Sequence, residues 1–184
     1  LLSEAGLTEL KEEDKWSLEP GKGYYLNRSG RSMAAFRVGT APLPQYRIIA
    51  SHTDSPHLRL KMDSVTKEGT MLTGRTSVYG GPIMNTWLDR PLGLAGLVVV
   101  KKEGKTENLL FDSQEPIGLI PNAAIHLNRE VNKGYEIKPQ THLPVMLNIH
   151  EDFRDYLAGK LNVEAENILS SQLELYLPDN PVIM

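Results

Sequence analysis

An apolar run meets a polar break in RIIASHTDSPHLRLK, residues 47–61. The run at residues 48–50 is typical of a short buried strand. The polar cluster after it ends in Pro56, which has no amide hydrogen and disfavours helical backbone at Ser55. His52 and Asp54 are therefore expected at the carboxyl end of a strand, where open α/β sheets bind their ligands.

The spacing of His52 and Asp54 points to one kind of chemistry. Residues two apart in extended backbone point to the same face. An imidazole placed there can bind a metal while the carboxylate fixes its tautomer and orientation. Taken alone, however, a His-x-Asp pair is more simply interpreted as a strand-end histidine hydrogen-bonded to a turn-forming aspartate. The surrounding sequence has to decide between these interpretations.

Two further blocks of sequence favour the metal-binding interpretation of His52 and Asp54. Residues 79–90, YGGPIMNTWLDR, run into PLGLAGLVVV, and Ala124-Ile125-His126-Leu127 follows shortly after Ile120-Pro121. Together with HTDSP, in this order and at this spacing, they resemble the aspartyl aminopeptidase family, zinc aminopeptidases related to vacuolar aminopeptidase I. The resemblance covers nearly the whole chain, matches the N-terminal part of that family, and is far more specific than any single block.

The resemblance implies roles for three residues. His52 matches the first zinc-ligand histidine of the family, and Asp54 matches the acid that orients it. His126 matches a histidine that the dimerisation domain projects into the neighbouring subunit's active site, to hydrogen-bond the substrate carbonyl or the oxyanion. From its apolar neighbours alone, His126 also fits an edge-strand histidine that faces a partner or solvent.

The other histidines are assigned ordinary positions. His57 is expected on the polar side of the strand that follows Pro56, because Leu58 and Leu60 alternate with Arg59 and Lys61. His142 and His150 are expected at strand edges, with no partner motif.

A cocatalytic zinc site needs more ligands than these. Two metals take about four ligands each, one of them a bridging carboxylate, and a further carboxylate accepts a proton from water. The resemblance places the family's remaining ligands and its Glu-Glu pair after Met184; Glu12-Glu13 lies in a charged loop with the wrong context. We therefore expect the sequence to be part of a longer polypeptide, the alternative being a short product that cannot build the site alone.

The amino-acid composition argues against several kinds of partner and of metal site. The 184 residues are 40% hydrophobic and 23% charged, which is ordinary for a globular protein. The net charge is −3 and the basic residues are scattered, which argues against a nucleic-acid or membrane-surface partner. There is no cysteine, so disulfides and thiolate metal sites are excluded. This fits a cytoplasmic protein, and no apolar run approaches the ~20 residues of a membrane span.

The predicted fold class is α/β: the start of a zinc-exopeptidase catalytic domain with an inserted β-rich dimerisation domain. Residues 1–65 would open the catalytic domain, 66–172 would form the insertion, and 173–184 would be a strand that returns to the catalytic domain. Strands are expected at 23–27, 32–38, 58–62, 70–76, 94–102, 108–112, 144–149 and 173–177. Glu103-Gly104-Lys105 is expected to link two of them as a hairpin. One helix is expected at 151–161.

The predicted function is that of a metal-dependent aminopeptidase that removes N-terminal, by resemblance acidic, residues from peptides. The resemblance implies two zinc ions per complete site and a homodimer that builds to a dodecamer. The same ligand types also accept cobalt or manganese. The alternative is a non-catalytic oligomerisation module, or a fragment of such an enzyme that is inactive alone.

Overall fold

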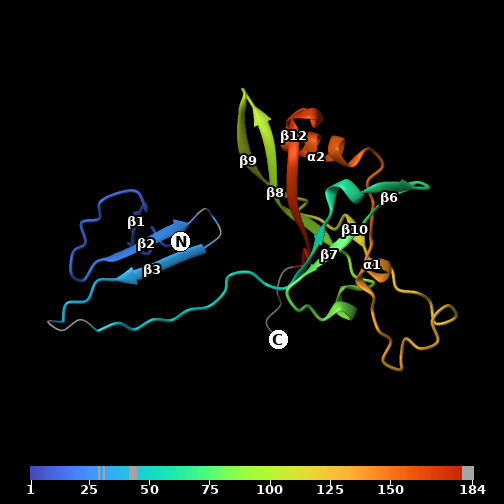
Figure 1. The fold of residues 1–184 in the computed structure, drawn as a ribbon, viewed down its shortest axis with the longest axis horizontal. Coiled ribbons are helices and arrows are strands. Elements are labelled where there is room, and N and C mark those ends of the chain that lie inside the picture. Colours follow the sequence, from blue (N-terminus) through green and yellow to red (C-terminus); the bar gives the residue numbers. More distant parts are fainter. Residues whose placement is uncertain (29, 31, 42–44, 180–184) are drawn as a thin grey trace. The chain divides into compact units, whose positions relative to one another are not determined.

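The computed structural model describes residues 1–28, 30, 32–41 and 45–179. The chain divides into two compact units, Leu1–Asp54 and Ser55–Met184, and each is treated separately below. In Figure 1 the first unit runs from blue to cyan, and the second from cyan to red. Among the described residues, no helix combines the length and the apolar character needed to cross a membrane.

The first unit is built on a three-stranded sheet in the order β1-β2-β3. Strand β1 (Thr8–Leu10) is parallel to β2 (Gly23–Arg28), which pairs antiparallel with β3 (Ser32–Arg37). The two strands predicted at 23–27 and 32–38 are thus confirmed. Gly30 has a φ of 67° in the turn between them, and its amide donates to Asn27 Oδ1 at 3.0 Å. Glycine suits this turn because it adopts positive φ without steric cost.

Residues 45–56 form neither helix nor strand. Ile48 and Ile49 are 85% and 99% exposed, so the buried strand predicted at residues 48–50 is wrong for this structure. An apolar run becomes a strand only where a neighbouring strand accepts and donates its backbone hydrogen bonds. In the described ranges, no strand pairs with residues 48–50.

The second unit is built around a five-stranded antiparallel sheet in the order β7-β4-β12-β8-β9. Its strands are β4 (His57–Leu60), β7 (Thr76–Tyr79), β8 (Gly93–Lys102), β9 (Lys105–Asp112) and β12 (Ile168–Tyr176). The predicted strand at 94–102 and the hairpin after it are confirmed, with Glu103 and Gly104 in the turn at φ of 51° and 79°.

A four-stranded sheet accompanies it in the order β10-β11-β6-β5. Its strands are β5 (Thr66–Glu68), β6 (Met71–Gly74), β10 (Gly118–Leu119) and β11 (Val145–Leu147). Short 3-10 turns occur at Met62–Ser64, Met84–Trp87 and Ala165–Asn167, and a single helical turn, α1, spans Pro139–His142.

Helix α2 (Phe153–Leu161) confirms the predicted helix, two residues shorter at its start. It begins after Asp152, whose side chain accepts a hydrogen bond from the Arg154 amide at 2.8 Å. Such a cap satisfies an amide that the first turn leaves without a partner. The helix ends at Asn162, which adopts the left-handed conformation at φ 55°.

The core of the second unit follows from strand alternation. Leu58 and Leu60 of β4 are buried, as are Leu173 and Leu175 of β12, while the residues between them lie on the opposite face. Burying each such side chain stabilises the fold by about 1.5–3 kcal/mol. The other face of these two strands carries polar side chains, as is common for antiparallel sheets with one packed face.

The compact units divide after Asp54, eleven residues before the boundary predicted at residue 65. Strand β4 pairs with β7 and β12, so its long-range partners place it in the second unit. Strand β12 begins at Ile168 rather than at 173 and lies between β4 and β8, also within the second unit. Which residues belong to a catalytic and which to a dimerisation domain stays a prediction.

Candidate metal-binding segment

His52 and Asp54 contact each other as their spacing predicts. The His52 Nδ1 atom lies 2.6 Å from the Asp54 carbonyl oxygen and 3.2 Å from its carboxylate Oδ1. A carbonyl oxygen only accepts, so Nδ1 carries the proton. The lone pair is then on Nε2, the state in which a neutral imidazole binds a metal, with a carboxylate at its other nitrogen.

The pair is exposed, with 77% of the His52 side chain and 49% of the Asp54 side chain open to solvent. Within the described part of the chain, no three His, Cys, Asp or Glu side chains gather in a way that could hold a metal ion. His52 therefore fits zinc chemistry as one nitrogen ligand, and a complete site needs ligands in addition to it.

His126 belongs to the second unit, in a turn at residues 125–127 between β10 and α1. The turn is closed by the Leu127 amide, which donates to the Ala124 carbonyl at 2.8 Å. His126 is exposed, and its neighbours Ile125 and Leu127 are 47% and 84% exposed. It thus lies in an exposed turn, rather than in the edge strand that its apolar neighbours also allowed.

His142 was predicted at a strand edge. It is instead the last residue of α1. Its Nδ1 accepts the Lys138 amide at 2.8 Å, and the Tyr135 hydroxyl lies 2.5 Å from Nε2. The pair lines a hollow of about 640 Å³ together with Met71 and Met146. Both ring nitrogens are engaged inside the fold, so the ordinary interpretation of His142 holds. His150 is exposed and lies outside the strands.

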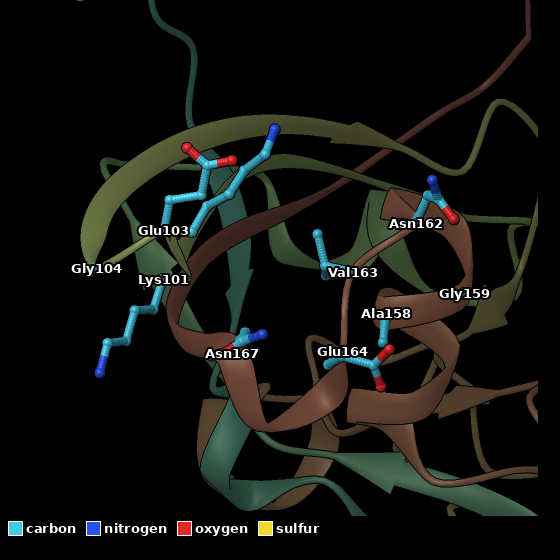
Figure 2. Close-up of a pocket in the computed structure, with 10 residues that line it drawn as sticks. Lys101, Glu103, Gly104, Ala158, Gly159, Asn162, Val163, Glu164 and Asn167 are labelled. Atoms are coloured by element: carbon cyan, nitrogen blue, oxygen red, sulfur yellow. The ribbon is translucent and has the colours of Figure 1, made fainter.

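A second hollow, of about 510 Å³, lies between the β8–β9 turn and the end of α2. Figure 2 shows Glu103 and Gly104 on one side of it and Asn162 and Val163 on the other. Lysine and glutamate side chains both line it. These mixed charges do not form a set of metal or nucleophilic groups.

Sequence reasoning missed the surroundings of His57. Its ring is stacked on Tyr79 with centroids 4.6 Å apart, and its Nε2 lies 3.1 Å from Glu174 Oε1. Strand alternation correctly places His57 on the polar face of β4. The pairing of β4 with β7 and β12, which supplies Tyr79 and Glu174, has no local signal in the sequence.

Comparison with known families gives a match over residues 1–183 to the model described as aminopeptidase I zinc metalloprotease (M18). A protein of Clostridium novyi, named as a probable M18 family aminopeptidase 2, is 41% identical over 188 residues, which cover 96% of this chain and 43% of that protein. The chain thus spans less than half the length of such relatives.

Solved structures agree. The cryo-EM structure of the Ape4 and Nbr1 complex matches 96% of this chain and 39% of its own, with a TM-score of 0.85 and 28% identity. Chaetomium thermophilum mApe1 matches 97% of this chain and 45% of its own, with a TM-score of 0.80 and 28% identity. The S. cerevisiae mApe1 dodecamer matches 97% of this chain and 42% of its own, with a TM-score of 0.70; at 24% identity this likeness shows the fold alone.

Proposed function

Because the chain belongs to the M18 family of zinc metallo-aminopeptidases, we propose that the protein removes N-terminal residues from peptides by metal-assisted hydrolysis. The observation that carries the proposal is the His52–Asp54 contact, which fixes the proton on Nδ1 and leaves Nε2 as a metal-binding nitrogen. The preference for acidic N-terminal residues and the cytoplasmic location are parts of the same proposal.

In this proposal His52 binds zinc and Asp54 orients the imidazole. When bound, zinc polarises the peptide carbonyl and lowers the pKa of the attacking water. A complete site would hold two ions, and this chain would contribute one of the histidine ligands. Because Asp54 holds Nδ1 through both its carbonyl and its carboxylate, the ring is prevented from switching to the other tautomer.

We further propose that the protein associates with copies of itself, first as a dimer and then as a dodecamer like the one formed by S. cerevisiae mApe1. His126 would reach the neighbouring subunit's active site and hydrogen-bond the substrate carbonyl or the oxyanion. Its exposed position between two exposed apolar side chains supports this, since such a turn suits burial by another subunit.

The second candidate is a non-catalytic oligomerisation module, or a fragment that is inactive alone. It is supported by the lack of any group of three or more potential metal ligands among the described residues. Aminopeptidase activity of the natural polypeptide, and its loss on removing metal with a chelator, separates the two candidates.

The direct test uses His52→Ala and Asp54→Asn in the natural polypeptide, with His150→Ala as the control because His150 is exposed outside the strands. We expect His52→Ala to abolish activity and to weaken zinc binding, measured by competition with a chromophoric chelator. Asp54→Asn should lower zinc affinity by roughly 10–100-fold, the usual effect of losing a partner that orients a ligand. Normal turnover by His52→Ala would remove the metal assignment.

A further inference from the structure

His57 holds the backbone just before its own strand. Its Nδ1 lies 2.8 Å from the Ser55 carbonyl oxygen, to which it donates. Its ring stacks on Tyr79 at an interplanar angle of 17°, and only 12% of its side chain is exposed. The side chain is thus fixed by the sheet and in turn fixes the peptide at Ser55.

Pro56, between these two residues, is held as well. The ring of Pro56 packs against Gly80, where an added Cβ would lie 3.4 Å from the Pro56 Cβ and Cγ. Gly80 has a φ of 68°, a conformation that favours glycine. Residues 55–57 are therefore braced internally by a hydrogen bond and are tied to the end of β7 by a ring stack and a packing contact.

Glu174 of β12 completes the arrangement. Its Oε1 lies 3.1 Å from His57 Nε2, a close contact that is not aligned as a hydrogen bond. The same oxygen accepts from Gln172 Nε2 at 3.1 Å and from Arg59 Nη2 at 3.4 Å. The Arg59 guanidinium also lies 5.5 Å from the centroid of the Tyr79 ring. We name His57, Tyr79 and Glu174 the His57 clamp.

We propose that His57 is a positioning residue for metal binding, because it fixes the chain at Ser55, three residues after His52. This inference rests on the proposed function. A segment that is already restrained loses less conformational freedom when one of its side chains binds a ligand, and its affinity is correspondingly higher. The clamp therefore strengthens metal binding at His52 without touching the metal.

The test separates the hydrogen bond from the ring stack by two substitutions in the natural polypeptide. His57→Asn keeps an N–H donor near the Ser55 carbonyl, whereas His57→Phe keeps an aromatic ring on Tyr79 and has no donor. Zinc affinity is measured by chelator competition, amide hydrogen exchange is measured over residues 48–56, and the melting temperature of the metal-free protein reports folding. His150→Phe is the matched control.

We expect His150→Phe to bind zinc as the wild type does, and His57→Asn, which keeps the donor to Ser55, to bind zinc more tightly than His57→Phe. His57→Phe should keep the melting temperature, exchange faster over residues 48–56, and bind zinc about tenfold more weakly, the lower end of the range for residues that orient ligands. If His57→Phe and the wild type bind zinc equally well while His52→Ala binds it clearly more weakly, the positioning role of the His57 clamp is wrong. The proposed function would then still stand. Unchanged zinc binding by His52→Ala would overturn the proposed function and the clamp with it.

Discussion

Gly96 allows two neighbouring strands to approach each other closely because it has no side chain. It lies in β8 opposite Leu173 of β12, at a φ of 151°. A Cβ at this position would lie 2.1 Å from the Gln172 carbonyl oxygen and 3.1 Å from the Leu173 Cα. Both are backbone atoms of the strand in the middle of the sheet, so they cannot move aside as a flexible side chain would.

Gly96→Ala is therefore expected to destabilise the protein by about 1–3 kcal/mol, the usual cost of forcing extra atoms into a packed site. Gly159, in the last turn of α2 and with open space where a Cβ would lie, is the matched control. Gly159→Ala should stabilise the protein by about 0.5–1 kcal/mol through helix propensity. Urea unfolding measures both, and equal stability of the two variants would show that β8 and β12 are further apart than described.

The candidate metal-binding pair was partly predictable from the sequence. The spacing of His52 and Asp54 correctly predicted their contact, because side chains two residues apart in extended backbone share a face. The strand expected before them was wrong, because a strand depends on a distant partner and residues 48–50 carry no signal for one. The catalytic roles of His52, Asp54 and His126 remain predictions.

Among the elements, those with local signals were predicted well. The β8–β9 hairpin has a turn of Glu103 and Gly104 after the apolar run of β8, and α2 has acidic residues near its start. Strand β12 was predicted to begin five residues too late, because Leu169, Ser170 and Ser171 do not form an alternating pattern. They form a strand because β8 provides a long partner, with a register shift between Ile168 and Ser170.

A side-chain hydrogen bond crosses β8 and joins its two neighbouring strands, β12 and β9. Tyr176 of β12 lies opposite Gly93, where an added Cβ would lie 2.6 Å from the Tyr176 ring. The missing side chain leaves space for the ring, and the Tyr176 hydroxyl donates to Asp112 Oδ1 of β9 at 2.6 Å. This hydrogen bond lowers the pKa of Asp112. A second hydrogen bond, from the Gln114 amide, has a smaller effect in the same direction.

The bridge predicts a dependence of stability on pH. Because the pKa of Asp112 is lower in the folded than in the unfolded protein, its contribution is present above the ordinary carboxyl pKa of about 3.9 and is lost as pH falls through the lowered pKa. Tyr176→Phe should raise the pKa of Asp112 and flatten this part of the stability profile. An NMR titration of the Asp112 carboxyl carbon, with Tyr135→Phe as the control, measures the shift; identical titrations in the wild type and Tyr176→Phe would contradict it.

For the whole molecule, the resemblance to a known family predicted more about identity and fold than the periodicity of apolar residues did. Three short blocks placed the chain in the M18 family, and the family model matches residues 1–183. The compact units divide after Asp54, eleven residues before the domain boundary predicted at residue 65, because β4 pairs with β12, which is distant in sequence. The division into a catalytic and a dimerisation domain stays a prediction. The His57 clamp was missed for the same reason, since Glu174 is 117 positions after His57 and reaches it only through strand pairing.

The proposed assembly predicts that active sites are shared between subunits. If His126 acts in the neighbouring subunit's site, His52→Ala and His126→Ala each damage every site in their own homo-oligomer. In a mixed oligomer, some sites would combine an intact His52 from one subunit with an intact His126 from another. Dissociating the two inactive natural-length variants and reassembling them together should then restore part of the activity, in proportion to the fraction of such sites.

The control for this complementation is each variant dissociated and reassembled alone, which should remain inactive, with the oligomeric state followed by light scattering. His52→Ala mixed with Asp54→Asn is the matched negative pair, because both changes lie in the same segment and therefore damage the same half of a shared site. No recovery in mixed oligomers of His52→Ala and His126→Ala would place both histidines in one subunit's site, and a monomer in solution would remove the shared site altogether. Recovery confined to the His52→Ala and His126→Ala mixture is expected only if the turn at residues 125–127 completes a site on another copy of the chain.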